Sequence, residues 1–530
     1  MAHLITRLLA ELRSDPTALE RQSADDLVAS LVLARAPGAK RQAWSDLAKR
    51  ASDAVGVPCA GGLLRARSED DIVRLVHHAR KEKLRLRAVG AAHSIASAIG
   101  DTDAAVDDLV VALDGDLRKI EITESDGRLR ARVGAGCNLG VNPSDPTSND
   151  ANSVCRTLEK HGYSLPILGG IAHQTVAGFL QTGSSGGSLQ HAMSDIVVEI
   201  ELVDGTGTKR VLKAGTDELH AAAVSMGLYG ILTHVTLDLA PSYWVEGTEE
   251  NVPFADSLLA RGADGKRGLE RALSEVEYLH LNWFPQKHVQ RVMQWKGTRR
   301  PPGGALVPYE NTLRNKLVAG VAAAVLELES ALVQIDAESE AVQLLMGFLM
   351  RRFLPLGDVQ RFNDVWHHAL PTDDQVAVDT VIKTFFTEVW IPAEETGRVL
   401  DVMEQLFRDR AAAGNFATEI YGAKRSKFWL SPAHDRDVVR IDPYWWAHNY
   451  GTPEAYFTRF WDVLLDIPGA RLHWGKFMPK PGQRCGGTTF DAAYLHRVYP
   501  RLGDFLELRR DFDPDGIFVT PYWRDQLAIP

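Results

Sequence analysis

The chain has 530 residues, of which 45% are hydrophobic and 24% are charged, as in an ordinary folded protein. A chain of this length is too long to fold around one small hydrophobic core. We therefore expect at least two domains. The formal net charge of −10 argues against a nucleic-acid-binding groove, which needs a clustered excess of Lys and Arg.

The cysteines and the first residues bear on the cellular compartment. The four cysteines form no CxxC pair, so we predict neither a disulfide framework nor a zinc site, and no other metal site is indicated. The beginning of the sequence lacks the basic segment, the long apolar segment and the cleavage site of a secretory signal. A cytoplasmic location is therefore expected.

The first half of the chain alternates short strands with helices. Residues 1–50 are predicted as an N-terminal helical extension, and Ser68-Glu69-Asp70-Asp71 begins a helix with capping-box character. Up to about residue 244 the pattern is typical of an α+β fold rather than of regular βαβ units. Strands are predicted at 84–89, 109–113, 119–123, 129–133, 196–203 and 228–239, and a helix at 154–161.

A second unit is predicted from 245 to 480, followed by a C-terminal segment from 481 to 530. Strands are expected near 278–283, 289–295, 383–390 and 416–420, and long helices from about 311 to 353. The most apolar stretch, Leu317 to Val333, contains Glu327 and Glu329, which favours a buried or amphipathic helix over a membrane span. A second apolar segment with basic flanks, Leu344 to Leu354, leaves peripheral membrane contact open.

Three small-residue motifs compete as functional sites. Gly134 to Gly140 follows a strand, but its glycine spacing and the prolines after it do not match a nicotinamide dinucleotide fingerprint. Gly183-Ser184-Ser185-Gly186-Gly187 contains the letters GxSxG, which in a hydrolase would present Ser185 as a nucleophile. Arg87 to Ser94 is a strand followed by a small-residue turn, and such a turn lets backbone N–H groups approach a pyrophosphate closely.

Several separated segments together resemble the vanillyl-alcohol-oxidase-like (PCMH-type) FAD-binding family, in its branch of sugar lactone oxidases and alditol oxidases. Arg87 to Ser94 looks like the first pyrophosphate loop, and Leu165 to Gly187 looks like the second FAD-contacting segment. Leu472-His473-Trp474-Gly475-Lys476 is similar to the HWGK signature of this branch. The tail from Tyr499 to Phe518 also fits the closing helix and turn of the family.

The resemblance implies a two-part FAD-binding domain, 51–244 plus 481–530, with an inserted α+β substrate-binding cap at 245–480. It implies FAD bonded covalently through His93, with hydride transfer from an alcohol carbon to flavin N5 and O2 as the acceptor, giving H2O2. The implied catalytic residues are Lys476, Glu419 and His473, and the implied substrate contacts are Tyr421 and Arg425. The implied cofactor-binding residues are Arg87, Val89, Gly90, Ala91, Ala92, His93, Ser94, Gly169, Gly170, Val176, Gly178, Thr182, Gly183, Ser184, Gly186 and Ile196.

Two departures from the family pattern affect these expectations. Alditol-oxidising relatives carry an arginine two residues after the glutamate, where this sequence has Tyr421, so a larger or less polar small-to-medium organic substrate enters consideration. The polar stretch from Asn138 to Asn152 is predicted as an exposed loop. Two alternatives remain open at this point: a serine hydrolase that uses Ser185, and a catalytically silent flavin-fold binding protein.

Overall fold

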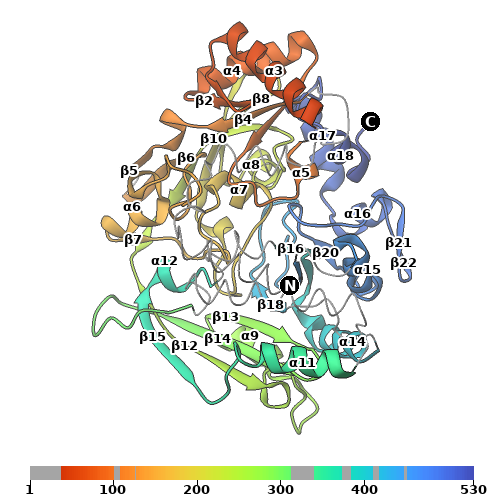
Figure 1. Cartoon of the computed structure of the whole chain (residues 1–530). Coiled ribbons are helices and arrows are strands. Elements are labelled where there is room, and N and C mark those ends of the chain that lie inside the picture. Colours follow the sequence, from red (N-terminus) through yellow and green to blue (C-terminus); the bar gives the residue numbers. More distant parts are fainter. Residues whose placement is uncertain are drawn as a thin grey trace, which may run out of the picture.

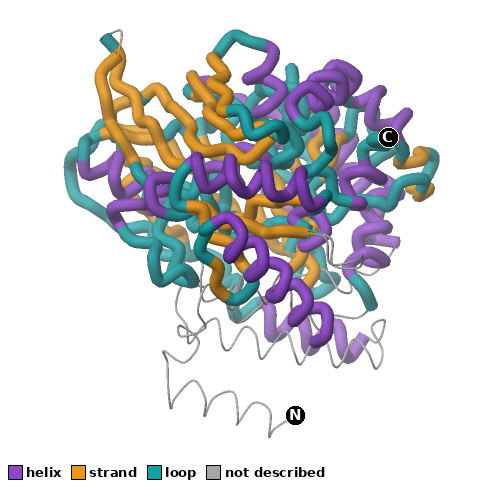
Figure 2. The backbone as a smooth tube through the Cα atoms, turned by 90° about the horizontal axis from the view of Figure 1, so that it is seen from above, coloured by secondary structure: helices purple, strands orange, loops and turns teal. Residues whose placement is uncertain are grey.

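The computed structural model describes residues 38–100, 108–125, 127–311, 340–372, 384–409, 417–446 and 451–530. Within them, helices and strands are both distributed over the molecule, as the colouring of Figure 2 shows. The sheets formed by residues 59–238 occupy the upper part of Figure 1, and the strands between residues 244 and 365 lie in the lower part. The predicted α+β fold class is confirmed.

The first sheet has four strands in the order β1 (Cys59–Ala60), β2 (Leu63–Ala66), β4 (Asp108–Leu113) and β3 (Arg85–Val89). Strands β2, β4 and β3 run parallel. Helices α3 (Gly38–Val55) and α4 (Glu69–Glu82) cover this sheet, because their apolar faces share one buried cluster with its strands. As predicted, α4 begins at an N-cap serine, where Ser68 accepts a hydrogen bond from the backbone N–H of Asp71. Of the predicted N-terminal extension, only residues from 38 onward are described.

The second sheet is antiparallel and has five strands. Their order is β5 (Ile120–Ser125), β6 (Arg128–Gly134), β10 (Gly230–Asp238), β8 (Val197–Asp204) and β9 (Lys209–Lys213). Its strands were predicted as β-type runs separated by turn residues, and each predicted strand is present within a few residues. The smaller elements around it are α5 (Ala96–Ile99), α6 (Val154–Lys160), α7 (Val176–Gln181), α8 (Asp217–Ala222) and the two-stranded pair β7 (Tyr163–Ser164) and β11 (Ala240–Pro241).

The third sheet is also antiparallel and takes its strands from Trp244 to Leu472. Its order is β15 (Val359–Val365), β12 (Trp244–Pro253), β14 (Arg291–Arg300), β13 (Tyr278–Phe284), β18 (Thr418–Ala423), β19 (Val438–Trp446), β17 (Val389–Pro392) and β20 (Arg471–Leu472), and β16 (Thr384–Phe386) pairs with β19. The helices in this part of the chain are α9 (Gly268–Glu275), α11 (Glu340–Met350), α12 (Trp366–Ala369), α14 (Thr396–Asp409) and α15 (Pro453–Leu464).

The C-terminal segment packs beside the first sheet. It contains the hairpin β21 (Gln483–Cys485) and β22 (Thr488–Phe490) and the helices α16 (Ala492–Val498), α17 (Leu502–Phe512) and α18 (Pro521–Gln526). The backbone N–H of Leu86 in β3 donates to the carbonyl of Ile517 over 2.8 Å, and the indole of Trp523 donates to the carbonyl of Ala98 over 2.9 Å. The division into domains at residues 51, 245 and 481 stays a prediction.

Arg87 joins three segments that are distant in the sequence. Its buried guanidinium donates hydrogen bonds to five backbone carbonyls, those of Ala98, Ile99, Met226, Gly227 and Phe518. Burial lowers the pKa of Arg87 to about 10, so the side chain remains charged at neutral pH. The residue ties the loop after β3 to the loop before β10 and to the C-terminal segment.

Two expectations about loops and helices differ in outcome. The stretch from Asn138 to Asn152 was predicted as an exposed loop, and this is wrong for its first part. Asn138 and Asn142 are buried, and Arg118 donates to Asp145 over 2.8 Å and to Asn138 over 3.1 Å. Most of the stretch from 311 to 353, in which long helices were predicted, lies outside the described residues, and its described part contains α11. No described helix combines the length and the apolar character that spanning a membrane requires.

We predict that Arg87→Lys lowers the free energy of unfolding by about 3 kcal/mol, because an ammonium group cannot satisfy five buried carbonyls in fixed directions. Urea titration followed by circular dichroism measures this loss. Arg271→Lys is the matched control, since the Arg271 side chain is 78% exposed and should leave stability unchanged. Equal stability of the two variants would contradict the conclusion that Arg87 holds the three segments together.

Candidate active site

A cavity lies where the first two sheets meet the C-terminal half of the chain. Its walls come from segments far apart in the sequence, and this is possible only because the C-terminal segment returns to β3. The lining includes the loop 87–94, parts of the ranges 112–118, 135–145, 174–184 and 226–232, and the residues His473, Lys476 and Trp523.

The loop after β3 approaches α7 so closely that side chains are excluded. A Cβ atom on Gly90 would lie 2.4 Å from Oγ1 of Thr175, the N-cap residue of α7. Ala92 has a φ of 58°, a backbone conformation that also favours a small residue. The backbone N–H of Ile95 donates to the carbonyl of Gly475 over 2.9 Å, so the loop is joined directly to the segment that carries His473 and Lys476.

His93 points a buried polar atom into this environment. Its Nε2 has no hydrogen-bond partner among the described residues, and its ring centroid lies 4.4 Å from that of His173. Burial, with smaller contributions from His173 and Lys476, lowers the pKa of His93 well below its usual value. The side chain is therefore neutral, which leaves a ring nitrogen available for a bond to a group in the cavity.

The hydrogen bonds of His473 define its tautomer. The backbone N–H of Gly475 donates to Nδ1 over 3.1 Å, so the proton of the neutral ring is on Nε2, which lies 3.1 Å from Oγ of Ser184. Burial lowers the pKa of His473 to about 4. Thr182 Oγ1 lies 3.2 Å from the same Ser184 oxygen and donates to the carbonyl of Gly178. His473 thus orients a row of hydroxyl groups along the cavity.

One face of the third sheet presents charged side chains in register. In one row across the strands lie His280, Tyr421, Arg440 and Trp390, and in the next row lie Asn282, Glu419 and Asp442. Cross-strand partners and residues two apart share a face, so these side chains gather on one side. Arg440 donates to the backbone carbonyl of Ser185 over 2.8 Å, which links this face to the loop that borders the cavity.

Glu419 and Tyr421 belong to this charged face. Oε1 of Glu419 lies 2.8 Å from Nε2 of His280, and both side chains are buried. Tyr421 packs edge-on against His280 and lies under the guanidinium of Arg440, whose Cζ is 4.1 Å from the ring centroid. A second, smaller cavity is lined by Gly169, Gly170, Gly186, His280 and Tyr421, among others.

The structure brings most of the predicted residues together, in two places. The first cavity is lined by Arg87, Val89, Gly90, Ala91, Ala92, His93, Ser94, Gly178, Thr182, Ser184, His473 and Lys476. The second is lined by Gly169, Gly170, Gly186 and Tyr421. Val176 lies in the hydrophobic core, Gly183 forms a turn with a φ of 74°, and Ile196 packs against the core beside β8.

Arg425 lies apart from both cavities. Its side chain is 64% exposed and pairs with Asp437 over 3.1 Å, and it lines neither cavity. Ala423, at the end of β18, pairs with Val438 at the start of β19, so Arg425 falls beyond the sheet. The geometry gives the predicted substrate contact no support.

The sequence reasoning missed Glu388, Arg440 and Asp442, which are all buried on the charged face. A signal for two of them was present, because Arg440-Ile441-Asp442 places charges two residues apart within the otherwise apolar strand β19. Charged side chains on one face of a buried strand must find partners. The side-chain contact between Glu388 and Arg440 follows only from the pairing of β17 with β19.

Ser185 lacks the setting of a hydrolase nucleophile. It follows the short helix α7 instead of lying at a turn between a strand and a helix. Its backbone carbonyl accepts the hydrogen bond from Arg440, and the neighbouring Ser184, not Ser185, contacts a histidine. The serine hydrolase alternative is therefore abandoned.

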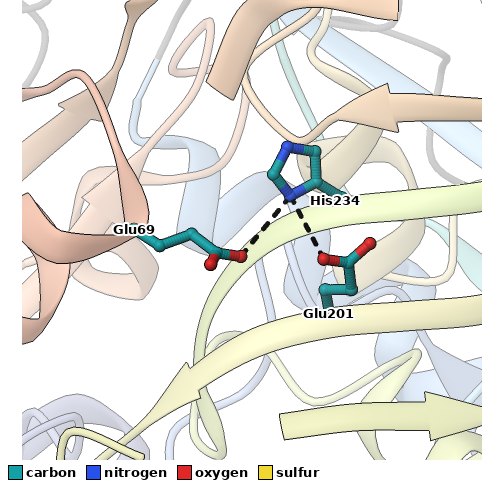
Figure 3. Close-up of side chains that lie close together, drawn as sticks. All are labelled: Glu69, Glu201 and His234. Atoms are coloured by element: carbon teal, nitrogen blue, oxygen red, sulfur yellow. Dashed lines mark ion pairs between the residues drawn. The ribbon is translucent and has the colours of Figure 1, made fainter. Parts of the chain in front are cut away.

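A separate cluster of Glu69, Glu201 and His234 lies between α4 and the second sheet (Figure 3). Nδ1 of His234 is 3.6 Å from an oxygen of each carboxylate. Arg132 pairs with Glu201 over 2.6 Å and Lys209 pairs with Glu69 over 3.3 Å. Because both carboxylates have cationic partners, we interpret the cluster as an ion-pair network that joins the helix to the sheet.

Acid should destabilise the fold partly through His473. A folded-state pKa of about 4, below the ordinary 6.5, contributes stability that is complete above pH 6.5 and is lost as the pH falls toward 4. The contribution is about 3 kcal/mol. Urea titrations at pH 7 and pH 4.5 should therefore show a smaller pH-dependent loss in His473→Gln than in the unmodified chain. An identical loss in both proteins would show that His473 is not a buried neutral group.

Comparison with known proteins agrees with this geometry. Residues 60–213 match the family described as FAD binding domain. The chain is 28% identical to D-arabinono-1,4-lactone oxidase of Eremothecium gossypii over 86% of this chain and 90% of that protein. It is 25% identical to alditol oxidase of a Streptomyces species, over 71% and 78%, and 25% identical to L-gulono-1,4-lactone dehydrogenase of Mycobacterium tuberculosis, over 89% and 97%.

The fold is shared with a solved structure of cholesterol oxidase from B. sterolicum, at a TM-score of 0.66 and 16% identity, covering 88% of this chain and 94% of that one. Residues 235–526, more than half of the chain, match the family described as D-arabinono-1,4-lactone oxidase. The chain belongs to the D-arabinono-1,4-lactone oxidase family, in the sugar lactone and alditol oxidase branch of the PCMH-type flavoproteins.

Proposed function

We propose that this protein is a covalent flavoenzyme that oxidises an alcohol carbon of a small polyhydroxylated compound or of its lactone and uses O2 as the electron acceptor. The observation that carries the proposal is the cavity that joins the loop 87–94 to His473 and Lys476. The buried, unpartnered Nε2 of His93 and the close approach at Gly90 fit a tethered flavin. FAD, when bound, supplies an acceptor for a hydride and passes two electrons to O2, giving H2O2.

The residues of the chain supply position and charge. Lys476 lines the cavity, where a cation stabilises negative charge that develops during the reaction. His473 holds Ser184 through a neutral hydrogen bond, so the hydroxyl row does not lose its direction near neutral pH. Glu419, paired with His280, is the group we propose to take the hydroxyl proton of the substrate.

The polar groups that line the cavities support a polar substrate. They include Ser184 in the first cavity and His280 and Thr372 in the second, and hydroxyl-rich molecules hydrogen-bond to such groups whereas apolar molecules do not. We therefore propose alditols and aldonolactones, the compound classes named for the relatives, ahead of the less polar substrates that Tyr421 had brought into consideration. Measuring peroxide formation with alditols, aldonolactones, sterols and aromatic alcohols tests this preference, because the first two classes should give the highest rates.

We predict that His93→Ala abolishes covalent flavin attachment. The unmodified protein should give a fluorescent band on a denaturing gel, and the variant should release all of its FAD on acid precipitation. His173→Ala is the matched control, because its ring lies beside that of His93 and should leave the attachment intact. A fluorescent band in His93→Ala would exclude His93 as the tether.

We predict that Lys476→Met slows flavin reduction by the substrate about 100-fold, because one preorganised charge near the reacting group is lost. Stopped-flow absorbance with the best substrate of the peroxide screen gives the rate. Lys424→Met is the control, since Lys424 pairs with Asp195 away from the cavity. A yellow protein that no compound of the screen reduces would favour the silent flavin-fold alternative.

A further inference from the structure

Lys476 does not stand alone at the cavity wall. Its Nζ lies 3.6 Å from the ring centroid of Phe386 and 3.9 Å from Oε1 of Glu388. The side chain is only 13% exposed. At this depth a cation needs a compensating charge to remain protonated, and Glu388 is the carboxylate on that side.

Glu388 is oriented by contacts that occupy its other oxygen. Oε2 accepts a hydrogen bond from Nη2 of Arg440 over 2.7 Å and lies 3.2 Å from the indole N–H of Trp390. Its backbone carbonyl accepts from the N–H of His473 over 3.2 Å, which ties Glu388 to the segment that carries Lys476. The buried carboxylate therefore directs Oε1 at Lys476.

Arg440 is the fixed end of this arrangement. Its guanidinium lies between two aromatic rings, with Cζ 4.4 Å from the centroid of Trp390 and 4.1 Å from that of Tyr421. It also donates to the carbonyl of Ser185 and pairs with Asp442 over 2.7 Å. A planar cation held by stacking and by several acceptors cannot follow a moving carboxylate, so Glu388 is held in place.

The surrounding charges favour an ionised Glu388. Burial alone would raise its pKa, but Arg440, His473 and Lys476 outweigh burial and lower it. Asp442 has the opposite behaviour, because burial and the neighbouring Glu388 and Glu419 raise its pKa well above the usual value. Of the two carboxylates on Arg440, Glu388 is therefore the one that carries negative charge toward the cavity.

We propose that Glu388 is a positioning residue that holds Lys476 protonated and aimed at the cofactor cavity. It acts through Lys476 and does not itself line that cavity. Glu388, a carboxylate of the charged face, thereby contributes to the reaction through Lys476. This role rests on the proposed function only in so far as Lys476 serves the flavin.

The decisive variant is Glu388→Gln, which keeps the shape of the side chain and removes its charge. We expect the pKa of Lys476 to fall by about one unit, because an opposite charge 3.9 Å away is lost in a buried setting. Acetylation of Lys476 at pH 8, followed by peptide mass spectrometry on the FAD-loaded and the FAD-free protein, should become about tenfold faster. This measurement does not depend on turnover.

The same variant should change catalysis in a particular way. The rate of flavin reduction should fall with little change in KM, and the limb of its pH profile that reports deprotonation of Lys476 should move down by about one unit. Glu388→Asp keeps the charge but moves it away from Lys476 by the length of one methylene group. Acetylation of Lys476 in this variant should therefore be faster than in the unmodified protein and slower than in Glu388→Gln. This variant also decides the question if Glu388→Gln does not fold.

Glu249→Gln is the matched control. Glu249 is a carboxylate on β12 of the same sheet, where it accepts a hydrogen bond from the hydroxyl of Tyr309. Because β12 is far from β17 in the strand order, the loss of this charge should leave Lys476 unchanged. Equal acetylation of Lys476 in Glu388→Gln and the unmodified protein would overturn the proposal. Faster acetylation in a protein that no donor reduces would instead support the positioning role and reject the proposed function.

Discussion

Burying an ionised group costs several kcal/mol unless it is paired, and this constraint shapes the junction between the third sheet and the cofactor cavity. Arg440 and Glu388 have almost no contact with solvent. Each therefore depends on the other, and the strands β17 and β19 must keep their register for the pair to form. The loop at Ser185 is drawn into the same arrangement by the hydrogen bond from Arg440.

A similar constraint operates at the other end of the cavity. Among the described residues, Arg87 has no carboxylate within hydrogen-bond distance. Its guanidinium instead donates hydrogen bonds to backbone carbonyls of three segments. Carbonyl dipoles there take the place of a directly bonded carboxylate, with Asp108 and Asp513 acting on Arg87 from farther away. A loop of small residues without acidic side chains suits the pyrophosphate of a dinucleotide.

Much of the fold could be predicted from the sequence, because strands such as β6 are β-type runs between turn residues and helices such as α4 carry caps. The pyrophosphate loop, His93, His473 and Lys476 could be found because they lie in contiguous motifs. Glu388 and Arg440 could not be linked in advance, because their contact depends on which strands pair. The error at Asn138 has a related cause, since its polar side chain is buried by Arg118, which lies 20 positions earlier in the chain.

The cavity draws its walls from both ends of the chain, and this bears on when it can form. Trp523 lines it and Phe518 accepts a hydrogen bond from Arg87, so residues more than 400 positions after β3 complete a site that begins there. During synthesis the N-terminal sheets are made first, yet the cavity is not closed until residues 518–523 have left the ribosome. The first two sheets can therefore form well before the cavity that they border is complete.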